Sequence, residues 1–168
     1  MSNLLHVSAN SYSGINKADH NYKIWNELAK GFDEYYLFAR SSRNKFETFK
    51  EDNITLILIP KIVNPARVFI LSSFLIFFYI KKLKITHILC QSAIFGGTAS
   101  ILAKKIFGIP VMIEIHGEEY FRLTESQKRY LKPLSKFLIF IYKSANKVRS
   151  LNPFMTQKLH KLGIKDNV

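Results

Sequence analysis

The sequence predicts an α/β fold, a doubly wound parallel sheet of about six strands with helices on both of its faces. Two observations lead to this prediction. Short apolar segments alternate along the chain with segments of helical periodicity, and the connections between them are short. The apolar segments are nearly continuous rather than alternating apolar and polar, which is typical of parallel strands buried on both faces. Right-handed crossovers between such strands wind the chain in both directions from the centre of the sheet.

Each element has its own local signal. Strands are predicted where apolar, β-branched and aromatic residues run together, and helices where apolar residues recur every three or four positions and end near Gly or Pro. The strands are expected at 3–9, 34–40, 53–60, 84–92, 109–117 and 146–152. The helices are expected at 22–32, from Pro65 through the apolar stretch 68–80, at 93–107, at 118–144 with an interruption near Pro133, and at 153–163. In the first helix, Ile24, Trp25, Leu28 and Ala29 fall on one face.

The composition indicates one domain that spans residues 1–168. Apolar residues make up 48% of the chain, which excludes a disordered protein, and no repeat is visible. Lys and Arg number 25 against 12 Asp and Glu, a formal net charge of +13. This charge favours anionic partners, namely nucleic acid, acidic lipid headgroups or phosphorylated substrates, and does not choose among them. A genome rich in Lys, Ile, Asn and Phe codons is the alternative explanation.

The chain shows no signal of secretion or of a membrane span. Its first ten residues lack the charged and long apolar segments of a signal peptide, so we expect a cytoplasmic protein. Cys90 is the only cysteine, and its apolar neighbours predict a buried, inert thiol. The apolar segment Val68–Ile80 has 13 residues, whereas a spanning helix needs about 20. Because lysines follow this segment, it could instead contact the inner face of the plasma membrane as part of a peripheral protein.

Ligands of doubly wound sheets bind at the carboxyl ends of the strands, so the loops there are the candidate site. The loop after the first strand holds Ser13 and Gly14, where backbone N–H groups could approach a phosphate; an ordinary turn explains the glycine equally well. The loop after the fourth strand holds Gly96, and close packing of a helix against the sheet is the stronger explanation there.

A histidine and a basic cluster follow the fifth strand. His116 leaves the sheet beside Gly117, and its imidazole could bond a sugar hydroxyl or a phosphate, or serve a structural hydrogen bond. Lys128, Arg129 and Lys132 lie near one face of the next helix, as a solvated face or as a surface that meets phosphate. No histidine spacing suggests a metal site, so we expect no metal ion. No nucleic-acid-binding motif is present, so we expect no nucleic acid partner.

Three segments, in their order and spacing, resemble family 4 of the glycosyltransferases. HILCQSAIFGGTASILAKKIFGIPVMIEIHG resembles the block that runs from an apolar strand, through a helix of small residues, to G-I-P and H-G. SANKVRSLNPFMTQKLHKLGI resembles the strand and helix that come next in that family. LLHVSANSYSGINKADHNYKIWNELAKGF resembles its first strand, glycine loop and first helix. The resemblance covers essentially the whole chain.

The resemblance implies a Rossmann-like domain that is the N-terminal, acceptor-side half of a GT-B fold, in which two such domains face a cleft. It implies a generally retaining hexosyl transfer without a metal or another cofactor. The nucleotide-sugar donor is a substrate, and the acceptor is a glycan or a polyprenyl-phosphate-linked molecule in polysaccharide and cell-surface glycan synthesis. His116 would be catalytic, and Ser13, Gly14 and Gly117 would lie near the donor. The acceptor and membrane face, toward an anionic membrane surface, would comprise Lys128, Arg129 and Lys132.

The sequence also departs from that family. Only Gly14 stands where the family usually has two adjacent glycines, and Leu151, Asn152 and Pro153 occupy a turn where it usually has Ser. The family continues into a C-terminal donor-binding domain, which we expect to be absent here, so that the chain is inactive alone. The alternative hypothesis is a non-catalytic subunit that binds the acceptor and the membrane beside a separate donor-binding chain. A basic nucleic-acid-binding domain is the least favoured hypothesis.

Overall fold

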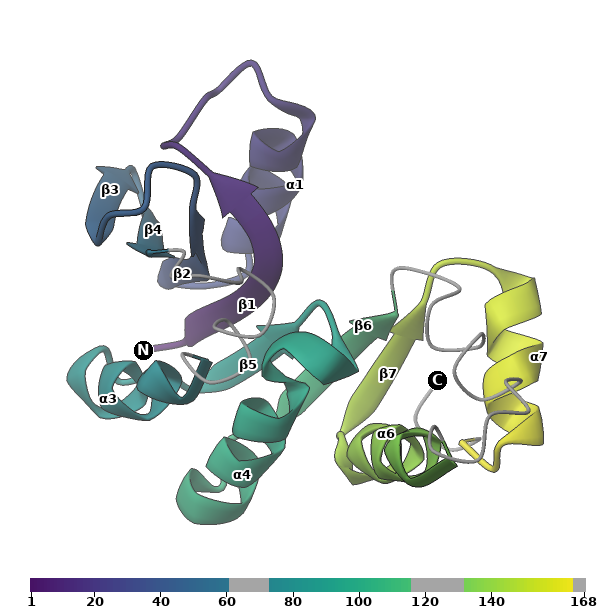
Figure 1. Cartoon of the computed structure of the whole chain (residues 1–168). Coiled ribbons are helices and arrows are strands. Elements are labelled where there is room, and N and C mark those ends of the chain that lie inside the picture. The colour runs from purple at the N-terminus through teal and green to yellow at the C-terminus, as the bar shows by residue number, and fades with distance from the viewer. Residues whose placement is uncertain (61–72, 116–131, 165–168) are drawn as a thin grey trace.

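A seven-stranded sheet organises the chain in the computed structural model, which describes residues 1–60, 73–115 and 132–164 (Figure 1). Its strands, in their order across the sheet, are β3 (Glu47–Glu51), β4 (Ile54–Ile59), β2 (Glu34–Ser41), β1 (Asn3–Tyr12), β5 (His87–Cys90), β6 (Val111–Ile115) and β7 (Lys147–Ser150). All neighbouring pairs are parallel except β3 with β4. The predicted doubly wound α/β fold is confirmed, because the chain proceeds from β1 to one side and then, through β5, to the other.

Helices cover the two faces of this sheet. The helical segments are α1 (His20–Ala29), η1 (Ser73–Leu75), α3 (Ile76–Lys82), η2 (Ala93–Gly97), α4 (Thr98–Phe107), α6 (Lys132–Ser144) and α7 (Pro153–Lys161). Successive residues of β1 point to opposite faces, so Leu4 packs in one buried cluster with Trp25 of α1, and Leu5 packs in the other with the buried residues of α3, α4 and α6. Figure 1 shows α3, α4 and α6 side by side below the sheet, apart from α1.

The strand β3 has no counterpart among the predicted strands. The segment of β3, ETFKE, is polar, with residues that are alternately half-buried and exposed, and it forms an antiparallel edge through a turn in which Asp52 has φ 52°. A polar edge strand gives no apolar run, so the count of about six strands is one too low.

Other boundaries also differ from expectation. β1 continues to Tyr12, because Ser11 and Tyr12 pair with the end of β2 after a register shift. Ile24 was placed on the buried face of α1 but is 42% exposed. α6 begins at Lys132, so Pro133 lies in its first turn, where proline is tolerated. The expected helical segments at 65–72 and 118–131 lie outside the described residues.

Candidate functional site

The two central strands meet at their carboxyl ends through a pair of polar side chains. Ser8 of β1 is fully buried, and its hydroxyl donates to Oε1 of Gln91, just beyond β5, over 2.5 Å. The backbone N–H of Gln91 also donates to the carbonyl of Val7 over 3.0 Å. The chain leaves β1 and β5 in opposite directions here, which is where doubly wound sheets bind ligands. We call this place the switch-point edge and define it by Ser8, Asn10, Tyr12, Gln91 and Ser92.

The remaining groups of the switch-point edge are uncharged. The exposed Asn10 donates from its backbone to Ser8 Oγ over 3.2 Å and from its amide to the Tyr12 hydroxyl over 3.3 Å. The Tyr12 ring rests edge-on against Trp25 of α1, with 4.9 Å between the ring centroids. Burial raises the pKa of Tyr12, so its phenol is neutral at physiological pH. The edge therefore offers neutral hydrogen-bonding groups, which suit hydroxyl-rich ligands.

Gly96 brings the helix that follows β5 against the central strands. It lies in η2, a π-helical turn, with φ +99°, and a Cβ placed on it would stand 2.6 Å from Cγ1 of Val7 and 3.4 Å from Sγ of Cys90. Only a residue without a side chain fits this approach. The explanation of Gly96 as a packing residue is confirmed. Its close contact with Val7 and Cys90 allows η2 to begin next to the switch-point edge.

Cys90 ends β5 and is fully buried, as predicted. Its thiol donates to the carbonyl of Ser92 over 3.1 Å, and burial raises the pKa of Cys90 to about 11 from its ordinary value of 9.0. The thiolate, which is the reactive form, is therefore roughly a hundredfold rarer than in an exposed cysteine below pH 9.

We expect Cys90 to react with an aromatic disulfide reagent at pH 8 only as fast as the protein unfolds. In guanidinium the same chain should release one equivalent of the chromophore at once. Rapid stoichiometric reaction of the folded protein would show that the thiol is accessible, contrary to its burial.

Ser13 and Gly14 lie just beyond β1, in a loop that lies close to β3 at the edge of the sheet. The guanidinium of Arg43 donates to the Ser13 carbonyl, and a Cβ on Gly14 would be 3.7 Å from the Phe49 ring of β3. Arg43 is exposed and its Nε lies 3.8 Å from Glu47, so its charge is shared with a carboxylate. The structure thus adds to this loop a cation that sequence reasoning missed, because Arg43 is 30 residues away along the chain.

The other predicted site residues are only partly covered. His116, Gly117, Lys128 and Arg129 lie outside the described residues, and β6 is described up to Ile115, which pairs with Ser150 of β7. Lys132 begins α6 and is exposed.

Two polar pairs on the α1 side of the sheet were not anticipated. Glu114 of β6 is 4% exposed, and its Oε1 accepts from the more exposed Arg149 of β7 over 2.7 Å. His6 of β1 and Tyr35 of β2 are both buried and share a hydrogen bond between Nδ1 and the phenol. Each pair joins neighbouring strands, so only knowledge of the strand order could have predicted it.

An open hollow of about 530 Å³ lies where β7 leads into α7. Asn152 caps the helix, because its Oδ1 accepts from the backbone N–H of Met155 over 2.9 Å, and Pro153 occupies the first turn. The hydroxyls of Ser150 and Thr156 lie 2.5 Å apart beside the cap. The residues that occupy the expected Ser position thus form an ordinary capped helix start, with two hydroxyls at the rim of the hollow.

The described part of the chain contains no group of three or more His, Cys, Asp or Glu side chains that could hold a metal ion. The residues that define the switch-point edge offer hydrogen bonding by neutral side chains, and Arg43 lies near the loop after β1. These groups can bind and orient a polar ligand.

No protein-family model and no curated protein matches this chain. Among solved structures, sucrose-phosphate synthase from Thermosynechococcus elongatus matches 99% of the chain with a TM-score of 0.73 and 12% sequence identity. The chain has the fold of one half of a GT-B glycosyltransferase. It spans 46% of that enzyme's length.

Two further structures match. A shorter chain of the same synthase gives a TM-score of 0.65 at 12% identity, and the match covers 99% of this chain and 85% of that one. MurG from Acinetobacter baumannii gives a TM-score of 0.45 at 13% identity, over 91% of this chain and 42% of the other. The expected GT-B half is therefore confirmed at the level of the fold by the synthase.

Proposed function

We propose that this chain is the N-terminal, acceptor-side half of a family 4 glycosyltransferase. The enzyme would transfer a sugar from a nucleotide-sugar donor to a lipid-linked or saccharide acceptor in polysaccharide or cell-surface glycan synthesis. One observation carries the proposal: a GT-B-type half sheet whose β6 ends at Ile115, immediately before the His-Gly pair at 116–117. The carboxyl end of a strand near the switch point is where such a sheet presents catalytic and binding residues.

In this proposal the residues of the chain have distinct roles. Ser8, Asn10 and Gln91 are neutral and hold one another in place, so they suit the hydroxyl groups of a sugar. Arg43, which contacts the loop at Ser13 and Gly14, would face phosphate oxygen. His116 would contact the donor sugar near the reacting carbon. A leaving nucleoside diphosphate needs more positive charge than this edge holds, and we assign that charge to the other half of the GT-B fold.

A titration of the purified chain with UDP-, GDP- and TDP-sugars tests this division. We expect no binding tighter than about 1 mM by calorimetry, a free energy of roughly 4 kcal/mol, and no donor hydrolysis. Adding a donor-binding half should produce sugar transfer. Turnover by the 168-residue chain alone would contradict the proposal.

The transfer assay with a donor-binding half distinguishes the alternative, a non-catalytic subunit. If transfer occurs with a separate donor-binding chain and is unchanged when His116 is replaced, this chain supplies acceptor binding only. If replacement of His116 abolishes transfer, the chain contributes a catalytic residue.

A further inference from the structure

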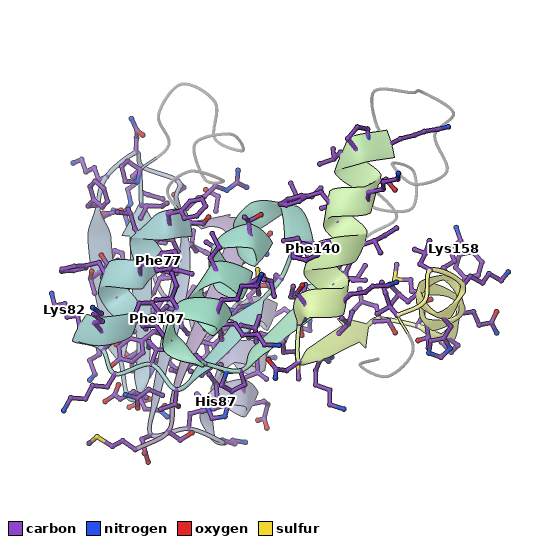
Figure 2. All side chains as sticks on the ribbon, turned by 90° about the horizontal axis from the view of Figure 1, so that it is seen from below. Phe77, Lys82, His87, Phe107, Phe140 and Lys158 are labelled. Atoms are coloured by element: carbon purple, nitrogen blue, oxygen red, sulfur yellow. The ribbon has the colours of Figure 1, made fainter. Side chains whose placement is uncertain are left out.

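The described helices, none of which is long and apolar enough to cross a membrane, divide unevenly between the two faces of the sheet. Buried residues of α3, α4, α6 and α7 belong to the cluster on one face, and Figure 2 shows α3, α4 and α6 side by side there. Among the described helices, only α1 contributes to the buried cluster on the opposite face. On that face, Met112 of β6 and Lys147 of β7 are exposed. At these two residues the face is therefore accessible to a ligand.

A pocket of about 280 Å³ lies on this face beside the end of α1. Its floor is the row of Leu89, Met112 and Lys147, which are neighbours in register across β5, β6 and β7 and so point to the same side of the sheet. Its wall is formed by Leu28 near the end of α1 and by Phe32 in the turn that follows. The pocket is therefore lined by apolar side chains, with one lysine at the end of the row.

Hydrogen bonds within the protein fix both ends of this pocket. The amide of Asn53 donates to the carbonyls of Ala29 and Phe32 over 3.1 Å each, which holds the turn that carries the Phe32 ring. At the other end, the backbone N–H of Val111 donates to Oδ1 of Asn146 over 3.0 Å, and the backbone N–H of Asn146 donates to the carbonyl of Val111 over 2.9 Å. The pocket is thus preformed, which lowers the cost of binding.

The apolar area suits a small molecule rather than a protein helix. After Met112 and Lys147, the next residues that β6 and β7 present to this face are Glu114 and Arg149, which pair with each other over 2.7 Å. A docking helix needs an apolar stripe along several turns, and these charged groups interrupt one. At roughly 30 Å³ for a water-sized group, the volume of 280 Å³ holds about nine such groups, the size of a molecule of about ten non-hydrogen atoms.

The charge beside the pocket is positive. Lys147 is exposed at the end of the row, so its ammonium is available to a ligand that lies on the floor. The carboxylate of Glu114 on the same face accepts from Arg149. The carboxylate of Asp33, next to the wall, accepts from the backbone N–H of Ser2 over 2.7 Å. These acidic groups are engaged with their own partners, and Lys147 favours an anionic ligand.

We infer that this pocket binds a small amphiphile, an alkyl chain of about eight carbons that ends in one anionic oxygen headgroup. The chain would lie on Leu89 and Met112 beside the Phe32 ring, and the headgroup would contact the ammonium of Lys147. The inference goes beyond the proposed function and stands without it, because it uses no residue of the switch-point edge.

Calorimetry with four molecules that share an octyl chain tests the inference. Octanoate or octyl phosphate should bind once per chain with a Kd of about 1 mM or tighter, and the tighter of the two identifies the headgroup. Octanol should bind about threefold more weakly, and octylammonium about tenfold more weakly, because the attraction to Lys147 is lost or reversed. Equal binding of octanol and the anions, or no binding of any of the four, would overturn the inference.

Carboxylates of increasing length measure the size of the pocket. From butyrate to octanoate, all below their micelle concentrations, the affinity should rise about fourfold for each added methylene, because each one leaves water. Beyond about ten carbons the gain should stop, because the volume of 280 Å³ is then filled. A rise that continues unchanged to dodecanoate would indicate surfactant binding to exposed apolar side chains, and the assignment of the pocket would be wrong.

A carboxylate on the floor should block the site. Met112→Asp should weaken octanoate binding at least about tenfold, since the alkyl chain would then bury a charged group. Leu102→Asp is the matched control, because Leu102 is 39% exposed and Met112 is 38% exposed, but Leu102 belongs to α4. The control should bind octanoate like the unchanged chain, and both variants should keep its circular dichroism. An equal loss of binding in both variants would contradict the location of the site.

Charge reversal tests the role of the lysine. Lys147→Glu should weaken octanoate binding about tenfold and strengthen octylammonium binding, because the sign of the charge beside the pocket changes. Lys136→Glu makes the same change in net charge at an exposed position on α6 and should alter neither. If both variants behave alike, only the net charge of the protein matters and the contact with Lys147 is wrong.

Sedimentation velocity tests a second copy of the chain as the occupant of this face. The inference predicts that Met112→Asp leaves the oligomeric state of the chain unchanged. A dimer that dissociates in this variant would place a second copy on Met112 and overturn the inference.

Discussion

Replacement of Gly96 by Ala should lower the free energy of unfolding by about 2–4 kcal/mol. Two costs combine at this position. The backbone has φ +99°, which a residue with a side chain rarely adopts, and the new methyl group would stand 2.6 Å from Cγ1 of Val7. Val7 is fully buried in β1, so relief of the contact requires movement of η2 away from the centre of the sheet. Guanidinium unfolding followed by circular dichroism measures the change.

Gly108→Ala is the matched control. Gly108 follows α4 with φ +70°, yet a Cβ there would meet nothing within 4 Å. Its replacement should cost only the backbone term, about 1 kcal/mol. The difference between the two variants isolates the contact with Val7. Equal losses of stability would mean that η2 accommodates the methyl group and that the close approach is not required.

The parallel part of the fold could be predicted because it obeys local rules. The runs at Ile54–Ile59 and Ile88–Cys90 are almost entirely apolar, which is typical of strands buried on both faces. Pro153 begins α7 and Gly108 follows the end of α4, in line with the conformational preferences of the two residues. The extension of β1 to Tyr12 and the strand at Glu47–Glu51 follow from pairing with β2 and β4. Pairing of that kind overrides a polar sequence and leaves no local signal.

The candidate site was less predictable than the parallel strands, because its contacts also depend on strand pairing. The position of Ser13 beyond the end of β1 could be derived, because the strands define the carboxyl edge. His116 lies outside the described residues. The bond between Ser8 and Gln91 and the contact of Arg43 with Ser13 join residues that are distant in sequence. They depend on which strands are neighbours, and the hydropathy pattern does not encode strand order.

The sequence does not predict which apolar residues of the helices stay exposed. Ile106 of α4 and Phe140 of α6 are apolar, yet they are 63% and 49% exposed. Their exposure follows from the packing of the helices, which buries only one stripe of each helix against the sheet.

Replacement of His116 by Ala should lower turnover by at least about tenfold once a donor-binding half is present. The reason is the proposed role: His116 follows β6, which is described up to Ile115, and its imidazole would contact the donor sugar. If the imidazole contacts the sugar mainly in the transition state, kcat should fall more than KM rises. Steady-state kinetics with the preferred donor provide both constants.

His87→Ala is the control for this experiment. His87 is exposed and is the first residue of β5 (Figure 2). It therefore lies at the amino edge of the sheet, opposite the switch-point edge. Its loss removes a contact with Phe32 and a hydrogen bond of 2.9 Å with Thr86, but no group of the proposed site. Turnover should stay within about twofold of the unchanged chain, less than 0.5 kcal/mol in barrier height. If both variants lose activity equally, the effect comes from general destabilisation, and if neither loses any, His116 does not act in transfer.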